Sequence, residues 1–196
     1  MIKTINMLYE EFKDYKNFYN KIELEEKKGN LIKIKRGLYE TNINREPFAL
    51  ANIIVSPSYI SFETALAYYN LIPEAVCIVK SATFKKNKKK EIRNRFSLYT
   101  YQDINPNAYP YGIDVIEIDG ENVKIASKEK ALLDTISIIS PRNNLKEIED
   151  LLFEDLRINE NIFDTLDMKS LMEMCDLYCS KSLKLLKKYI GERYDK

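Results

Sequence analysis

Residues 29–39 read GNLIKIKRGLY, and this stretch decides the fold predicted for the first part of the chain. Apolar and basic residues alternate over 31–35, as they do in a strand with one buried face. The Arg-Gly pair at 36–37 supplies a turn before the chain returns. Gly29 stands where a helix formed by the preceding residues would end. The stretch therefore predicts a small basic β-hairpin that follows a helix.

Two amphipathic helices are expected upstream of this hairpin. Apolar residues recur at helical spacing over 2–13 and again over 15–28, where Tyr19 belongs to the apolar stripe. Asp14 is the expected N-cap of the second helix. Helix, helix, glycine and hairpin is the order of a winged helix-turn-helix, which we assign to residues 1–45.

Residues 46–196 are expected to form an α+β domain with a small, mostly antiparallel sheet and a helical tail from about residue 127. The expected helices span 47–54, 62–69, 127–140, 144–156, 167–179 and 181–194. The expected strands span 76–84, 96–101, 115–118 and 123–125. A basic loop is expected over 85–93.

The 196 residues include no histidine, which excludes His-based triads, His general bases and His metal ligands. Three cysteines cannot form a disulfide framework. Cys175 and Cys179 lie four apart in a helical pattern but lack further ligands for a metal site, so we interpret both as small buried side chains. The composition favours a binding or regulatory protein, not an enzyme, with no metal and no cofactor.

The net charge of +1 conceals two basic islands. Residues 1–45 carry a net charge of +3 and residues 80–95 carry +7, while the rest of the chain is mildly acidic. Basic islands of this kind are the places where a protein would contact the phosphate backbone of a nucleic acid. No apolar run has the length of a signal peptide or a membrane span, and the odd cysteine count suits a reducing compartment. We expect a cytoplasmic protein that does not contact a membrane.

The first island carries the main candidate site, a DNA-binding surface. Polar and cationic side chains on the second helix are of the types that read base edges in a major groove, and hairpin cations would contact the backbone as a wing. These residues are Lys16, Asn17, Asn20 and Lys21 on the helix, and Lys33, Lys35 and Arg36 on the hairpin. The alternative is a solvated amphipathic helix beside an ordinary charged hairpin, which the glutamates on the same helix favour.

The second island is a candidate nucleic-acid or partner patch. Its cations would neutralise several phosphates, and binding would then depend steeply on salt. The alternative is a solvated loop tip that also protects the sheet edges. The residues concerned are Lys85, Lys86, Lys88, Lys89, Lys90, Arg93 and Arg95.

Asp114, Glu117 and Asp119 form an acidic candidate. Glu117 and Asp119 share a strand face, the spacing with which polymerase-like enzymes hold two Mg²⁺ ions. Nothing upstream supplies the glycine-containing turn that would seat a triphosphate. We interpret these carboxylates as a solvent-facing strand edge. A phosphoryl- or nucleotidyl-transferring activity, the alternative, would need Glu117 or Asp119 to bind metal.

Four segments stand in a characteristic order and spacing along the chain. They are GNLIKIKRGLY (29–39), PSYISFETALAYY with LIPE (57–74), ATFKK (82–86) and IASKEKALLD (125–134). Together they resemble the AbiEi family, the antitoxins of type IV toxin–antitoxin and abortive phage-infection systems. Asn70 departs from the family phrase, in which relatives often have glycine.

The resemblance implies an N-terminal winged helix-turn-helix that represses its own operon by binding inverted repeats in operator DNA. It also implies that residues 46–196 counteract a toxin of the nucleotidyltransferase class without a stable complex. The recognition and wing roles then fall on the seven residues named above for the first island. A second hypothesis is an antitoxin that neutralises its toxin by direct protein–protein binding and does not bind DNA.

Overall fold

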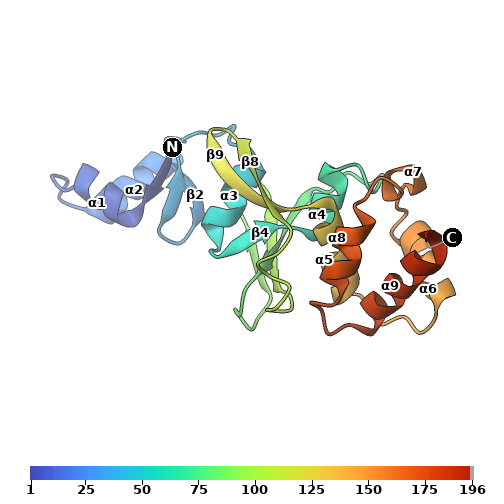
Figure 1. The fold of residues 1–196 in the computed structure, drawn as a ribbon. Helices are drawn as coiled ribbons and strands as arrows, with labels where there is room; N and C mark the ends of the chain where they lie inside the picture. The colour runs from blue at the N-terminus through green and yellow to red at the C-terminus, as the bar shows by residue number, and fades with distance from the viewer. Residues whose placement is uncertain (195–196) are drawn as a thin grey trace.

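The computed structural model describes residues 1–194 and has a mixed α+β fold, with two β-sheets and nine α-helices among those residues. Figure 1 shows an elongated molecule. The first residues form a small unit at one end, the larger sheet occupies the middle, and the last helices gather at the other end (Figure 1). The expected α+β class is confirmed.

The first 40 residues form a three-stranded antiparallel sheet, in the order β1-β3-β2, with two helices. Its elements are β1 (Ile2–Thr4), α1 (Ile5–Glu11), α2 (Phe18–Lys27), β2 (Ile32–Lys35) and β3 (Leu38–Glu40). A small core of five buried side chains joins helices to sheet: Leu8, Phe12, Ile22, Leu31 and Tyr39. We call residues 1–40 the N-terminal unit.

Three predictions for the N-terminal unit were wrong. The chain starts as a strand, not a helix, because Ile2 and Lys3 pair with β3, a partner that local periodicity does not reveal. Asn17, not Asp14, caps the second helix. Tyr19 is 74% exposed and does not belong to the buried stripe.

The larger sheet has six strands in the order β6-β7-β5-β4-β9-β8, with two parallel pairs (β5–β7 and β4–β9) and three antiparallel pairs. Its strands are β4 (Ser58–Ile60), β5 (Ile78–Thr83), β6 (Lys90–Arg93), β7 (Leu98–Asp103), β8 (Ile113–Ile118) and β9 (Glu121–Ala126). The prediction had missed β4 and had assigned Lys90–Arg93 to a loop. Both are short segments that are strands only because neighbouring strands pair with them.

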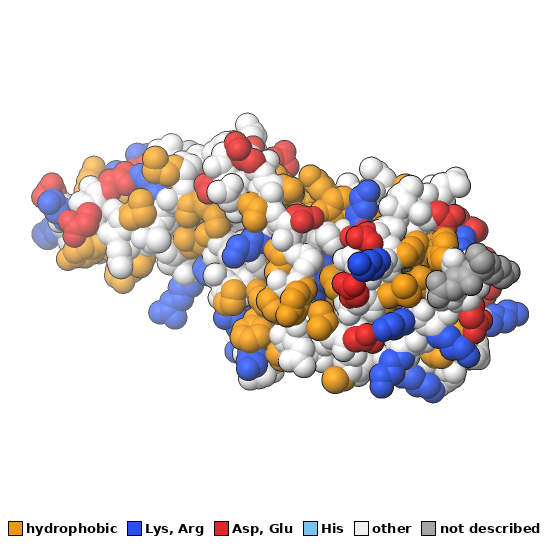
Figure 2. All heavy atoms as spheres, in the orientation of Figure 1, with side chains coloured by type: hydrophobic (Ala, Val, Ile, Leu, Met, Phe, Trp, Pro, Cys, Tyr) orange, Lys and Arg blue, Asp and Glu red, His pale blue; other side chains and the backbone are white. Residues whose placement is uncertain are grey.

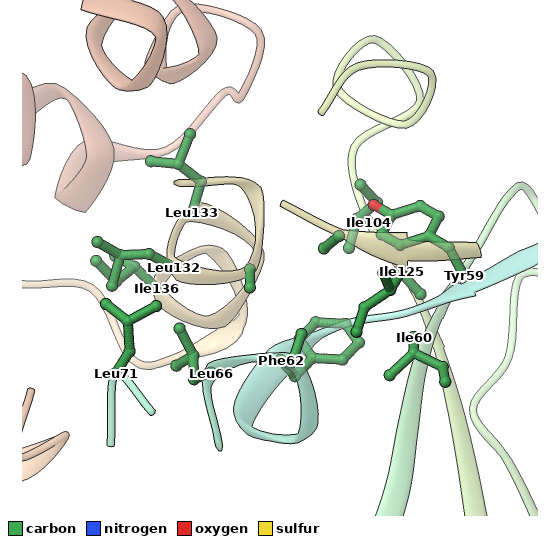
Figure 3. Packing of buried hydrophobic residues seen from close by; sticks show 14 of the residues in the cluster. Tyr59, Ile60, Phe62, Leu66, Leu71, Ile104, Ile125, Leu132, Leu133 and Ile136 are labelled. Atoms are coloured by element: carbon green, nitrogen blue, oxygen red, sulfur yellow. The ribbon is translucent and has the colours of Figure 1, made fainter. Parts of the chain in front are cut away.

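Helices cover both sides of the larger sheet. In Figure 1, α3 (Pro47–Ile54) lies on the side of the sheet that faces the N-terminal unit. The pair of helices α4 (Phe62–Tyr68) and α5 (Lys128–Ile138) lies on the other side. Figure 3 shows Leu66 of α4 pointing toward Leu132 and Ile136 of α5, while Phe62 lies toward the strand that carries Ile125. All five side chains are buried, which places the main core between the helix pair and the sheet.

Two positive φ angles flank the short helix α4. Its first residue, Phe62, has φ 56°, and Asn70, just after its C-cap, has φ 58°. Asn tolerates this left-handed conformation better than most residues with a side chain. A glycine at position 70 would adopt the same backbone without strain.

The C-terminal part is helical, as predicted, but its boundaries differ. The elements are α6 (Leu145–Asp150), a π-helical turn η1 (Leu151–Asp155), α7 (Glu160–Phe163), α8 (Met168–Cys175) and α9 (Lys181–Tyr194). Because α8 ends at Cys175, Cys179 lies beyond it and is exposed while Cys175 is buried. The prediction that both thiols are buried was therefore wrong for Cys179. None of the described helices is long and apolar enough to cross a membrane.

Candidate nucleic-acid interface

The start of α2 presents two of the four residues proposed for the recognition helix. Lys16 and Asn20 are exposed. Asn17 has a structural task, because its side-chain oxygen accepts a hydrogen bond from the backbone N–H of Asn20 at 3.2 Å. This bond satisfies one of the free donors at the start of the helix.

Lys21, the fourth proposed residue, is held within the unit. Its Nζ donates to the Glu25 carboxylate at 2.8 Å and lies 4.4 Å from the centre of the Tyr15 ring. The hydrogen bond to Glu25 raises the pKa of Lys21. The side-chain amide of Asn30 also donates a hydrogen bond to Glu25. The bond from Asn30, and after it the bond from Lys21, lower the pKa of Glu25 to about 2. The charge of Lys21 is therefore already paired.

The hairpin divides its three cations in a similar way. Lys33 and Arg36 are exposed, whereas Lys35 is partly buried and its Nζ donates to the backbone carbonyl of Ile54 at the end of α3. Burial, and after it the nearby positive charge of Lys90, lower the pKa of Lys35. Lys35 thus points away from the outer face of the hairpin and toward the larger sheet.

The second island forms a turn followed by an edge strand. All seven proposed cations are exposed. Lys85 and Asn87 have positive φ, and the Asp103 carboxylate fixes the turn by accepting from the backbone N–H of Asn87 and the hydroxyl of Thr83, each at 2.6 Å. The side chain of Lys86 reaches back and donates to the carbonyl of Ser56 at 2.9 Å. The turn is therefore anchored at both ends.

The two islands meet in one cleft of about 280 Å³. Lys35 comes from the hairpin, and three further lysines come from the second island, about fifty positions later in the chain. The other lining groups are neutral, so no acidic side chain of the described chain belongs to the lining. We call this the lysine cleft; its residues are Lys35, Ile54, Val55, Ser56, Thr83, Lys86, Lys88, Lys90 and Tyr101.

The lysine cleft lies among other basic groups. Figure 2 shows Lys and Arg side chains along the lower margin of the molecule, below the N-terminal unit and the larger sheet. Lys90 also lines a neighbouring cleft of about 260 Å³ with Lys89 and Lys80, the last of which is paired with Glu63 at 2.9 Å. Each island was predicted from the sequence, but their junction was not, because it depends on how β2 docks beside β6.

The acidic candidates lie on β8 and in the turn between β8 and β9. Among residues 1–194, no group of three or more Cys, Asp or Glu side chains could hold a metal ion. Asp119 accepts a hydrogen bond from the backbone N–H of Glu46 at 2.8 Å, and Arg45 donates to Glu121 at 2.6 Å. These carboxylates thus fasten the linker after the N-terminal unit to the β8–β9 hairpin. Glu117 is exposed on β8, an edge strand.

Sequence reasoning missed a buried polar network at the centre of the fold. Asp134 of α5 accepts hydrogen bonds from the hydroxyls of Tyr59 at 2.8 Å, Ser61 at 2.7 Å and Tyr178 at 2.5 Å. Lys130 donates to Tyr178 and lies 3.1 Å from Asp134. Ser61 occupies the N-cap position of α4, but its side chain makes no capping hydrogen bond because its hydroxyl donates to Asp134. The sequence pattern that could have revealed this network is a Lys and an Asp one helical turn apart within an apolar run, Lys130 and Asp134.

The charged pair of this network is shielded from solvent. The side chains of Lys130 and Asp134 are at most 1% exposed, and the carbonyl of Ala108 accepts a further bond from Lys130 at 2.7 Å. Burial lowers the pKa of Lys130 and raises that of Tyr178. The network joins β4, α5 and the turn that follows α8, so we assign it a structural role.

The fold and the site together define a mixed α+β protein with a cationic face that spans the N-terminal unit and the larger sheet. No protein-family model and no curated protein matches the sequence.

Proposed function

We propose that the protein is a DNA-binding antitoxin of the type IV, AbiEi-like class, which represses its own operon and counteracts a nucleotidyltransferase-type toxin. One observation carries the DNA-binding part. The exposed Lys16, just before α2, and the exposed cations of the β2–β3 hairpin lie on one small unit that contains two helices and a hairpin. A full winged helix-turn-helix usually has three helices, and this unit has two before its hairpin. In the proposed binding mode, α2 enters the major groove and the hairpin contacts the backbone.

The structure narrows the residues that would make these contacts. Lys16 just before α2, Asn20 on α2, and Lys33 and Arg36 on the hairpin are exposed and available to DNA. We assign Asn17 to the helix cap, and we leave Lys21 out of the primary contact set because its charge is paired. Arg or Lys contacts to phosphates would dominate affinity, and Asn20 is of the type that reads adenine.

The experiment is a binding titration with duplex DNA from upstream of the protein's own gene, at two salt concentrations. The variant Lys16→Gln/Lys33→Gln/Arg36→Gln removes three exposed cations from the N-terminal unit. The control Lys146→Gln/Lys169→Gln/Lys184→Gln removes three exposed cations from the C-terminal helices. We expect the first variant to bind more weakly and the slope of log K against log salt to fall by about 0.9 per lost contact. No binding by the wild type at low salt would refute the proposal.

The antitoxin part rests on the resemblance of four segments, and the structure brings two of them together. Tyr59 and Ser61 from residues 57–74 meet Lys130 and Asp134 from residues 125–134 in the buried network. Each of these two segments supplies polar groups that would be buried without a partner if the other segment were absent. Co-expression with the product of the neighbouring gene tests this part: we expect growth arrest by that product alone and recovery in the presence of this protein. Arrest that persists would count against it.

A second candidate function is direct neutralisation of a protein partner. Apolar and aromatic side chains are exposed on α1 and α2: Met7 is 48%, Tyr9 58%, Tyr19 74% and Leu24 46% exposed. Aromatic side chains are enriched at protein interfaces. Stable co-purification with the neighbouring gene product, lost in Tyr9→Ser/Tyr19→Ser, would favour this mechanism over DNA binding.

A further inference from the structure

We propose that the lysine cleft is a phosphate-binding site that holds the backbone of the same DNA duplex that the N-terminal unit contacts. This inference rests on the proposed function and extends it to the second part of the chain. It makes the second basic island a part of the DNA interface.

The first argument is the positioning of the lysines before any ligand arrives. Lys35 donates to the carbonyl of Ile54, and Lys86 donates to the carbonyl of Ser56, two residues further along. Each ammonium has three donors, so each keeps two for a ligand. Because the carbonyls already restrict these side chains, binding costs less conformational entropy than it would for free lysines.

The second argument is the imbalance of charge. Four lysines line the cleft, and none of its described lining residues is acidic. Partial burial, and after it the nearby charge of Lys90, destabilise the protonated form of Lys35. A phosphate in the cleft would offset this repulsion. Two acidic residues of the surrounding strands and helices are already engaged: Asp103 is bonded to Thr83 and Asn87, and Glu63 to Lys80. Glu91, next to Lys90, lies outside the lining of this cleft and lines the neighbouring one.

The third argument is size and position. A cleft of about 280 Å³ is at the small end of sites that enclose a small molecule, and it suits a phosphate group better than a whole nucleotide. Lys35 lies on β2, two residues after the exposed Lys33. A duplex backbone held by Lys33 would continue into the cleft, where the other cationic lining groups are Lys86, Lys88 and Lys90.

The test compares two triple variants within the same island. Lys86→Gln/Lys88→Gln/Lys90→Gln removes charges that line the lysine cleft, whereas Lys85→Gln/Lys89→Gln/Arg93→Gln removes the same charge from positions outside its lining. Each is titrated with the upstream duplex over a range of salt, after its thermal melt has shown that it is folded. We expect the slope of log K against log salt to fall by about 2 to 3 in the cleft variant and by less than about 1 in the control.

The outcomes separate this inference from the proposed function. Equal losses in the two variants would show a diffuse electrostatic effect and overturn the cleft as a site. Unchanged binding by the cleft variant, with tight binding by the wild type, would overturn the inference and leave the proposed function intact. No binding by the wild type would refute both. Inorganic pyrophosphate that binds the wild type but not the cleft variant, without competing with DNA, would identify a separate anion site and overturn the duplex contact.

Discussion

Lys130 and Asp134 lie one turn apart in α5, with the ammonium 3.1 Å from the carboxylate and both side chains buried at the centre of the protein. Burying two charges is costly unless each also has its hydrogen bonds satisfied. Here three hydroxyls and one carbonyl complete the set. Loss of one member would leave its partner as an uncompensated buried charge.

We therefore expect Lys130→Met to lower the free energy of unfolding by about 3 to 5 kcal/mol. Urea denaturation followed by circular dichroism measures the change. Lys146→Met, an exposed position on α6, is the control and should stay within about 0.5 kcal/mol of the wild type. The paired variant Lys130→Met/Asp134→Leu should lose less than the sum of the two single changes. A wild-type midpoint for Lys130→Met would contradict the role of the network.

The backbone elements that the sequence predicted well are those with strong local signals. The helix over Pro47–Ile54 was predicted with its observed bounds, because proline suits the first helical turn and an apolar run follows. The β2–β3 hairpin followed from its alternation and its Arg-Gly turn. By contrast β4 has three residues and exists because β5 and β9 flank it, which only the tertiary fold supplies.

In the candidate site, too, the features that follow from local sequence could be predicted and those that depend on the tertiary fold could not. Exposure of Lys16, Lys33 and Arg36 follows from their place on polar faces. The engagement of Lys21 by Glu25 could have been read from their i, i+4 spacing, which brings such side chains together on a helix. The engagement of Lys35 by the end of α3, and with it the lysine cleft, required the docking of two segments far apart in sequence.

Gly112 provides a second test of the packing around Lys130. Its φ is +64°, and a Cβ there would lie 2.8 Å from the Cβ of Lys130 and 3.0 Å from the sulfur of Met174. We expect Gly112→Ala to destabilise the protein by the cost of the left-handed conformation, about 1 to 2 kcal/mol, plus about 1 to 3 kcal/mol of overpacking. Gly29→Ala is the matched control, since φ is +78° there and the added Cβ meets open space. Equal thermal shifts for the two variants would contradict the close approach.

Asn17 distinguishes a capping role from a DNA-contact role. Asn17→Ala should lower the free energy of unfolding by about 1 kcal/mol, because the backbone N–H of Asn20 loses its acceptor. Asn17→Ser retains a capping oxygen and should keep most of the stability. If Asn17 acts only as the cap, Asn17→Ser should also keep the DNA affinity of the wild type in the titration described above. A stable Asn17→Ser protein that binds DNA much more weakly would return this residue to the contact surface.

Glu25 makes the stability of the N-terminal unit depend on pH. Its pKa is lowered in the folded protein to about 2, chiefly by the side chain of Asn30 and then by Lys21, so the folded state favours the ionised carboxylate. The resulting stabilisation is present above the ordinary pKa of a glutamate, about 4.3, and is lost as the pH falls toward 2. Urea midpoints at several pH values should therefore separate wild type from Glu25→Gln most at pH 5 and least near pH 2. Glu10→Gln, an exposed position on α1, controls for the simple loss of a charge. A gap between wild type and Glu25→Gln that stays constant over this range would show that the carboxylate contributes through packing alone.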